Sequence, residues 1–519
     1  MNAAALVSLG GYFVLMLAIG VYAYRKSTSD SAAYLLGGRQ LGPAVGALSA
    51  GASDMSGWIL LGLPGAVYVS GLSSAWIAVG LTIGAFFNYL LVAPRLRVYT
   101  ELADDAITIP DYLEKRFDDS RRALRILSAV VIIVFFTVYT SSGVVAGGKL
   151  FEASFGLDYR IGLFLTVGVV MAYTVFGGFL AVSLTDFVQG SIMFVALVMV
   201  PVVTIGVLGG WGSTSGILTE TNPALLAVFQ EATANGGAQA LSFLGLISLL
   251  AWGLGYFGQP HIIVRFMAIR SVKDIPTARH IGMSWMVITV LGAVLTGLAG
   301  RAYVASGEGG IAAYLDEAGR GGLAAFDPET IFILLSQVLF HPLVAGFLLA
   351  AILAAIMSTI SSQLLVSSSS LTEDIYRVFV KRSASERELV AVGRLSVLAV
   401  SAVAIALAFD RSSNILNLVS NAWFGFGSAF GPVILFSLFS RRMTRDGALA
   451  GMLTGALVVL FWIYAPPSAF GELRSGLAAI IPGFALATAA IFGVSAVTPS
   501  VPRVLAERHD EMTRRVGDP

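Results

Sequence analysis

The stretch Ala50-Gly51-Ala52-Ser53-Asp54-Met55-Ser56-Gly57-Trp58 interrupts an apolar segment that is long enough to cross a lipid bilayer. It places a carboxylate, hydroxyl groups and two glycines where a spanning helix should carry neither charge nor backbone freedom. Lipid tolerates such backbone only where it is buried in protein or lines a cavity. An ionisable residue at that depth indicates a functional site. This stretch therefore favours a membrane transporter.

The composition is that of a membrane protein with many spans. Of the 519 residues, 56% are hydrophobic and only 12% are charged, whereas soluble domains carry about 25% charged residues. The net charge of +1 gives no indication of a nucleic-acid partner. The absence of cysteine excludes disulfides and thiolate-bound metals, and four histidines argue against a catalytic zinc site.

The apolar runs predict an all-α protein with thirteen transmembrane helices and its N-terminus outside. All but six of the 32 Lys and Arg residues fall in segments that then face the cytoplasm, as the positive-inside rule requires. The first run has no basic residue before it, so it is a membrane helix rather than a secretory signal. The predicted spans cover about residues 5–24, 42–69, 72–96, 122–150, 160–179, 186–210, 239–268, 281–305, 342–371, 389–408, 412–440, 446–465 and 476–496.

Three polar segments lie between or beyond these spans. Residues 211–238 and 306–341 are long outer segments, and 328–340 could form a short outer helix. The tail 499–519 is predicted to be cytoplasmic and is too short for a signalling domain. The six outward-facing basic residues are Lys149, Arg160, Arg301, Arg320, Arg411 and Arg474.

A second interruption, Trp252-Gly253-Leu254-Gly255-Tyr256-Phe257-Gly258-Gln259-Pro260-His261, lies in the seventh span. Glycine lowers the cost of unwinding, and proline removes a backbone donor. The two interrupted spans each head a group of five, and an odd number of spans inverts the second group. We therefore predict one transporter domain, 1–519, whose parts are an extra helix 5–24, repeats 42–210 and 239–440, and two extra helices 446–496. Paired interruptions indicate a midplane binding site, although close packing or a kink is the alternative.

The first interruption suggests chemistry for both a cation and an anion. Unwound backbone exposes carbonyl oxygens that can replace the water shell of a cation. The free amides at the next half-helix, at Ser56 and Gly57, suit a carboxylate. Asp54 supplies negative charge for a cation, or it is a structural carboxylate bonded to backbone.

Polar residues on other spans fit the same interpretation less specifically. Ser358 and Ser362 lie one turn apart on the ninth span, with Thr359 beside them, although such hydroxyls usually bond to their own helix. In the seventh span the four-residue spacing of Trp252, Tyr256 and Pro260 predicts an aromatic stripe, for helix packing or for a small apolar ring.

Two further residues are candidates on weaker grounds. Tyr139, on the fourth span, could add a hydroxyl to the site. Asp186, at the predicted cytoplasmic end of the sixth span, is interpreted as a cap or gate residue rather than a ligand.

Three motifs resemble the sodium:solute symporter family. They are residues 52–58, residues 252–261, and Met357-Ser358-Thr359 followed by Gln363-Leu364-Leu365. The likeness covers nearly the whole chain and includes Leu371-Thr372-Glu373-Asp374. It implies the inverted 5+5 repeat fold of the bacterial leucine transporter, with one extra helix before the core and two after it.

The resemblance also implies roles for individual residues. It places sodium on the carbonyls of Ala52, Met55 and Ala355 and the hydroxyls of Ser358 and Thr359, with Asp54 needed for sodium dependence. Arg39 resembles an inner-side residue tied to sodium coupling, and Asp186 an acid on the inward ion route. The implied substrate-binding residues are Ser56, Gly57, Trp58, Tyr139, Trp252, Tyr256 and Pro260.

From this resemblance we expect a sodium-coupled symporter that imports L-proline across the cytoplasmic (inner) membrane by alternating access. Its partners would be sodium, proline and the lipid bilayer, with no nucleic acid and no obligatory protein partner. It would not be an enzyme, because the sequence contains no nucleophile–base pair. A symporter of the same fold for another small carboxylate, such as pantothenate, is the main alternative. A sensor would need an appended signalling domain, and a channel would not accumulate its substrate.

Overall fold

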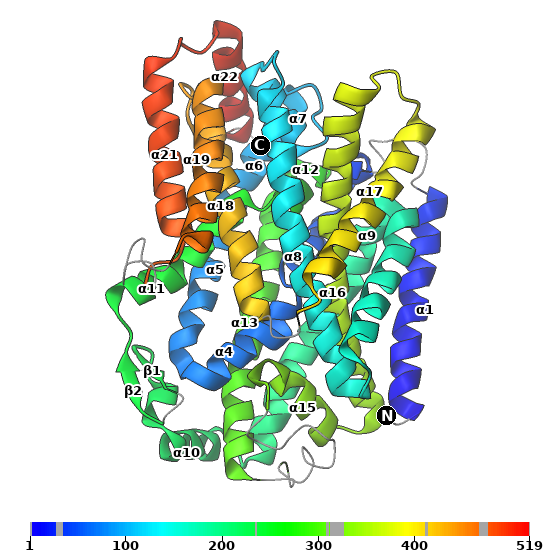
Figure 1. The fold of residues 1–519 in the computed structure, drawn as a ribbon, viewed down its shortest axis with the longest axis vertical. Helices are drawn as coiled ribbons and strands as arrows, with labels where there is room; N and C mark the ends of the chain where they lie inside the picture. Colours follow the sequence, from blue (N-terminus) through cyan, green and yellow to red (C-terminus); the bar gives the residue numbers. More distant parts are fainter. Residues whose placement is uncertain are drawn as a thin grey trace.

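The computed structural model describes residues 3–26, 35–233, 236–307, 311, 326–410, 414–466 and 476–517. Within these ranges the chain is almost entirely helical, and most long helices run along the longest axis of the molecule (Figure 1). Ten helical stretches are long and apolar enough to cross a membrane. The count of thirteen spans stays a prediction, because the interrupted spans are not single long helices.

The first half contains one interrupted span and several long helices. In chain order it comprises α1 (Ala3–Lys26), η1 (Gly37–Arg39), α3 (Pro43–Asp54), η2 (Trp58–Gly62), α4 (Leu63–Ser70), η3 (Gly71–Ser74), α5 (Ala75–Phe87), η4 (Asn88–Val92), α6 (Ala93–Leu102), α7 (Ile109–Phe117), α8 (Ala123–Phe155) and α9 (Tyr159–Val207).

The second half follows a small outer region. That region contains α10 (Trp211–Thr221), η5 (Pro223–Leu226) and the antiparallel pair β1 (Gln230–Ala232) and β2 (Ala238–Ala240). The remaining elements are α11 (Phe243–Leu250), η6 (Ala251–Gly258), α12 (Pro260–Ala268), η7 (Val272–Asp274), α13 (Ile275–Ser306), η10 (Pro328–Thr330), α15 (Ile331–Leu339), α16 (Pro342–Ser369), η11 (Ser370–Val380), α17 (Glu386–Leu407), α18 (Ile415–Phe439), α19 (Arg445–Tyr464), α21 (Ile480–Val497) and α22 (Arg503–Gly517).

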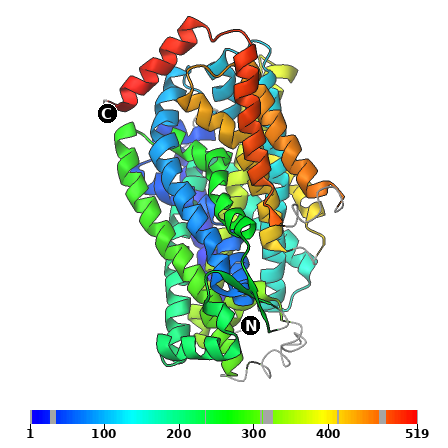
Figure 2. The ribbon, with the colours of Figure 1, turned by 90° about the vertical axis from the view of Figure 1, so that its left-hand side faces the viewer.

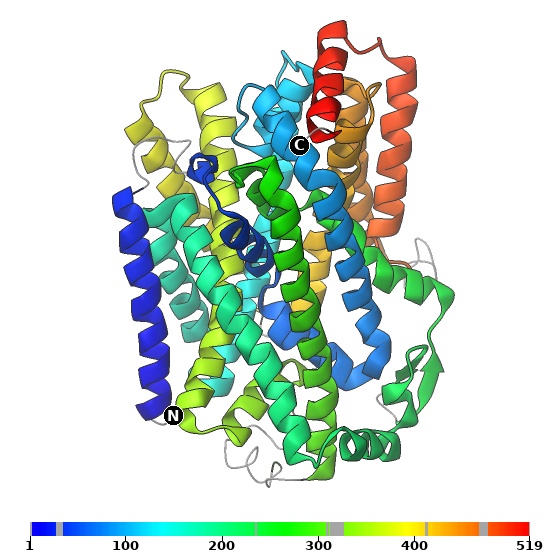
Figure 3. The ribbon, with the colours of Figure 1, turned by 180° about the vertical axis from the view of Figure 1, so that it is seen from behind.

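Neither interrupted span is a continuous α-helix. The first is divided between α3 and η2, and α3 ends in the middle of the molecule (Figure 3). The second changes from α11 to the 3-10 helix η6, and Gln259 is extended (φ −86°, ψ 103°) before α12 begins. The start of α3 and the end of α12 meet through backbone bonds between Leu41 and the 268–270 segment. The half-helices on this side therefore form one unit.

The two ends of the molecule carry different elements. The start of α1, α10 and α15 lie at one end of the molecule, whereas α7 and α22 lie at the opposite end (Figures 1 and 2). This separation agrees with the predicted placement of the outer segments and of the tail. The predicted short outer helix is present as η10 and α15. Arg320, Arg411 and Arg474, which we assigned to the outer side, lie outside the described residues.

One sequence prediction about a boundary was wrong, and the tail has more structure than we predicted. The loop predicted at 180–185 is helical, because the fifth and sixth spans meet directly at Gly178, whose φ of 61° glycine adopts readily. The tail is not merely polar chain: α22 is amphipathic and buries Leu505, His509 and Met512. Burial lowers the pKa of His509, so this surface is packed and not solvated.

Candidate cation and substrate site

The end of α3 leaves one carbonyl without its usual helical partner. Met55 departs from helical geometry (φ −82°, ψ 79°), and the Ser56 amide bonds the Asp54 carbonyl at 3.0 Å instead of continuing the helix. The carbonyl of Ala52 therefore has no amide at the position where a helix would supply one. Two hydroxyls on α16 face it, Ser358 at 2.7 Å and Thr359 at 3.5 Å.

This arrangement brings together four of the five predicted sodium-binding residues. The Ser358 hydroxyl lies 3.1 Å from the Ala355 carbonyl as well as close to Ala52. The hydroxyls donate to these carbonyls in the structure, and the same oxygens can turn their lone pairs to a cation. Neutral carbonyl and hydroxyl oxygens suit a hard monovalent cation. Met55, the fifth predicted residue, follows the same break, and its sulfur accepts from Thr289 on α13 at 3.5 Å.

Asp54 lies at the centre of the contacts between interrupted spans. Its side chain is 2% exposed, and one carboxylate oxygen accepts from the Tyr256 hydroxyl on η6. Its main-chain carbonyl accepts from the Trp58 indole at 3.1 Å and from Tyr139 on α8 at 3.4 Å. The other carboxylate oxygen, Oδ1, has no hydrogen-bond partner among the described residues. Asp54 thus joins both breaks and retains one free acceptor.

A small cavity adjoins Asp54 and contains a residue that we had not predicted. The cavity, of about 20 Å³, is lined by Asp54, Tyr256 and Asn88 among apolar side chains of α5, α12 and α13. Both amide atoms of Asn88, which is 1% exposed, lack partners in the described part of the chain. The space suffices for about one water and is too small for an amino acid. The only sequence signal was a polar residue within an apolar run.

Ser56 and Gly57 begin the second half of the first interrupted span. The Ser56 hydroxyl accepts from the Trp58 amide at 3.4 Å, as a local cap does. A Cβ on Gly57 would approach Ala146 to 2.9 Å and Ile356 to 3.3 Å. Glycine at this position therefore allows α8 and α16 to pack against the break.

The predicted aromatic stripe has a different geometry in the structure. Because η6 is a 3-10 helix, residues four apart do not stack as they would in an α-helix. Trp252 packs edge-to-face on Phe424 of α18 (5.0 Å between centroids), whereas Tyr256 faces Asp54. Pro260 is the first residue of α12 and lines a separate cavity nearer to α7. The three residues do not form one stripe.

Arg39 lies between the two interrupted spans, next to the start of α3 and the end of α12. Its guanidinium donates to the carbonyls of Met267 (3.0 Å) and Ala106 (2.8 Å) and to the Thr100 hydroxyl (3.0 Å). Burial lowers the pKa of Arg39 from its ordinary value. Arg39 therefore connects the chain before α3 to the end of α12.

Asp186 is not at a helix end as predicted, because the helix resumes right after Gly178. It lies about two turns beyond Gly178, in the middle of α9, and is 0% exposed. Its Oδ2 accepts from Ser49 of α3 at 2.7 Å and from Arg265 of α12 at 3.2 Å. A capping role is excluded by this position, and the acid instead joins α9 to both interrupted spans.

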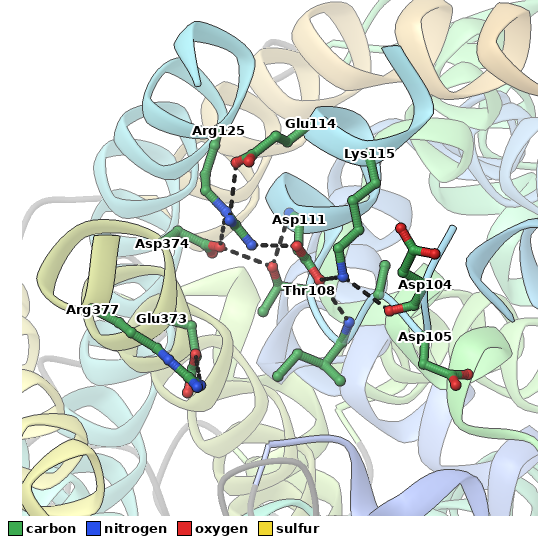
Figure 4. Close-up of polar contacts among 12 residues, drawn as sticks. Asp104, Asp105, Thr108, Asp111, Glu114, Lys115, Arg125, Glu373, Asp374 and Arg377 are labelled. Carbon is green, nitrogen blue, oxygen red and sulfur yellow. Dashed lines mark hydrogen bonds and ion pairs between the residues drawn. The ribbon is translucent and has the colours of Figure 1, made fainter. Parts of the chain in front are cut away.

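A separate cluster of charges joins α7, α8 and η11 (Figure 4). Arg125 of α8 pairs with Asp374 of η11 at 3.0 Å, with Asp111 and with Glu114 of α7 (2.9 Å). The Thr108 hydroxyl also donates to Asp374 at 3.0 Å. Asp374 therefore ties the end of the ninth span to α7 and α8, whereas Glu373 pairs with Arg377 of its own helix at 3.0 Å.

These features define a class of protein: an all-α, multi-pass membrane transporter with two interrupted helices around a buried polar site. Its fold is the leucine-transporter-like fold of sodium-coupled symporters. The structure superposes on a Na⁺-coupled sialic acid symporter with a TM-score of 0.77 at 19% identity, over 97% of this chain and 99% of that one. It also superposes on Mhp1, a nucleobase-cation-symport-1 family transporter, with a TM-score of 0.50 at 12% identity, over 94% and 99%.

Sequence comparison gives the family. The model of the sodium:solute symporter family matches residues 34–455. The chain is 57% identical to the osmoregulated proline transporter OpuE of Bacillus subtilis over 96% of each chain. It is 53% identical to a sodium/proline symporter of Staphylococcus aureus over 95% of this chain and 92% of that one. The chain belongs to the sodium:solute symporter family.

Proposed function

We propose that this protein is a sodium-coupled symporter that imports L-proline by alternating access. The observation that carries the proposal is identity of 53–57% over nearly the full length to proteins named as proline transporters or sodium/proline symporters. The protein is a multi-pass membrane protein of a transporter family. We place it in the cytoplasmic membrane, with its N-terminus outside and its C-terminus in the cytoplasm.

The geometry of the first break supports the sodium part of this proposal. Sodium would bind the carbonyls of Ala52, Met55 and Ala355 and the hydroxyls of Ser358 and Thr359. This set would join α3 to α16, which already meet through the Ser358–Ala52 contact of 2.7 Å. The negative charge of Asp54 lowers the cost of holding a cation in a site that is closed to water.

The second break supplies the apolar part of the proposed proline site. Trp252 and Tyr256 would contact the pyrrolidine ring, with Tyr139 and Pro260 completing the site. The amides at Ser56 and Gly57 and the adjoining Trp58 would receive the carboxylate. Because the cavity beside Asp54 measures about 20 Å³, the helices must separate before proline can enter.

The transport cycle then follows from the contacts between half-helices. Sodium binding first would fix the unwound backbone of α3 and so prepare the proline site. Import of one cation with a zwitterion moves net positive charge inward, which the membrane potential favours by about 2.3 kcal/mol per 100 mV. Opening on the cytoplasmic side requires the inner contacts of Arg39 and Arg265 to break.

Uptake of radiolabelled proline by proteoliposomes tests the function. We expect saturable accumulation that an inward sodium gradient stimulates and that excess unlabelled proline abolishes. Inhibition by pantothenate but not by proline would instead indicate the alternative carboxylate. Uptake that equilibrates without accumulating would indicate a channel.

A further inference from the structure

A fully buried arginine lies on the side of the proposed sodium site that we predict to face the cytoplasm. Arg265 of α12 is 0% exposed and pairs with Asp186 at 3.2 Å. Its other donors reach the hydroxyls of Ser49 (3.2 Å) and Ser362 (2.5 Å) and the carbonyl of His261 (2.6 Å). Our topology had counted it only as a basic residue near the cytoplasm. The structure instead places its charge among four helices.

The contacts of Arg265 locate this charge relative to the sodium site. Ser362 lies one turn beyond Ser358 on the same face of α16, which is about 6 Å along the helix axis. The guanidinium that bonds Ser362 therefore lies about one helical turn from Ser358, on the side that we predict to face the cytoplasm. Ser49 and Asp186 contribute from α3 and α9, so the same network links all four helices at this level.

We propose that Arg265 is a tethered cation that bars sodium from the cytoplasm until the inner helices open. The inference rests on the proposed sodium-coupled function and names a residue that enforces coupling. In the closed structure the guanidinium of Arg265 pairs with the carboxylate of Asp186, and its positive charge repels a sodium ion at close range. Two like charges separated by a few ångströms in a poorly solvated space repel strongly.

The same contacts explain how release could be ordered. Arg265 belongs to α12 and Asp186 to α9, so relative movement of these helices separates the pair. Asp186 already has one carboxylate oxygen, Oδ1, without a partner in the described part of the chain. Once Arg265 withdraws, the carboxylate becomes an uncompensated acid beside Ser362 and attracts the leaving ion. Sodium release then depends on the helix movement that also releases proline.

The charge-balanced double variant Arg265→Gln/Asp186→Asn tests the barrier. Proteoliposomes are loaded with radiolabelled sodium, and efflux is measured without proline. We expect sodium efflux to rise on the order of tenfold over wild type, because the repulsion from the guanidinium is lost while loss of the Asp186 charge offsets part of that gain. Arg265→Lys keeps the positive charge and should show the same low sodium efflux as wild type. Equal efflux from the Lys and double variants would overturn the role of the charge.

A matched control removes the other deeply placed Arg–Asp pair. Arg125→Gln/Asp374→Asn lacks an ion pair of 3.0 Å at the cytoplasmic end, about three turns beyond Ser362 along α16 and η11. It should not raise sodium efflux. A leak from both double variants, or from neither, would show that Arg265 only holds the helices together. Loss of sodium-stimulated uptake in wild type would instead refute the proposed function.

A second measurement leaves Arg265 intact, in case the double variant does not fold. The chain contains no cysteine, so Ser362→Cys provides a single thiol beside the guanidinium. A membrane-impermeant thiol reagent on the cytoplasmic side should label it when sodium and proline are both present. Sodium alone should protect it. Equal labelling under both conditions would overturn the proposal that Arg265 bars sodium until the inner helices open.

Discussion

The two interrupted spans carry different chemical groups at their breaks. The break after α3 exposes a carbonyl at Ala52 and carries an acid, Asp54. The break around η6 carries rings and a phenol, with Trp252 packed on α18 and Tyr256 directed to Asp54. The first break thus resembles an ion site and the second a wall for an apolar ring.

This difference shows that the inverted repeat duplicates backbone geometry but not side-chain chemistry. Both breaks leave half-helices whose inner ends meet at Leu41 and Ile269. At the first break, the Ala52 carbonyl meets the Ser358 hydroxyl of α16, which completes the cation site. If this division is correct, variants at the first break alter sodium dependence, and variants at the second alter proline affinity.

Asp54→Ala should have the largest effect. Loss of the carboxylate should raise the sodium concentration for half-maximal proline uptake by about 100-fold, because contacts to charged groups contribute about 1.5–3 kcal/mol. The measurement is uptake against sodium concentration at equal protein amounts. Glu220→Ala, on the exposed face of α10, is the control. Unaltered sodium dependence would remove Asp54 from the ion site.

Thr359→Ala should have a smaller effect of the same kind. It removes one neutral oxygen ligand, so the half-maximal sodium concentration should rise by about tenfold. Ser361→Ala is a matched control, since Ser361 bonds its own helix at the Ser358 carbonyl. A tenfold rise in the control as well would indicate a general disturbance of α16.

Trp252→Ala should act on proline rather than on sodium. Loss of ring contact worth about 1 kcal/mol should raise the half-maximal proline concentration about fivefold. The sodium dependence measured at saturating proline should stay unaltered. If both constants are unaffected, Trp252 serves only to pack η6 on α18.

Tyr139→Phe should give the smallest change, because its hydroxyl lies 3.4 Å from the Asp54 carbonyl, a weak hydrogen bond. We expect about a twofold rise in the half-maximal proline concentration. The measurement compares the half-maximal proline concentration for uptake in this variant with that in Tyr256→Phe. A larger loss in Tyr139→Phe than in Tyr256→Phe would move the centre of the proline site to α8.

Much of this site could be predicted because its residues break local rules. Asp54 and the Gly-rich stretch around Tyr256 stand out in apolar runs, and polar groups are costly in lipid unless they have a function. Asn88 and Arg265 break the same rule less visibly. Arg265 lies near the end of its span, where basic residues are ordinary. Nothing local distinguished it from the loop arginines.

The sequence by itself determined that this is a multi-pass helical membrane protein with two interrupted spans, because apolar length and misplaced polar residues are local properties. Only the tertiary structure decided the partners: Ser358 against Ala52, Tyr256 against Asp54, and Arg265 against Asp186. Each pair joins helices that are distant in the chain. Their approach depends on packing among several helices at once, which the spacing within one helix cannot encode.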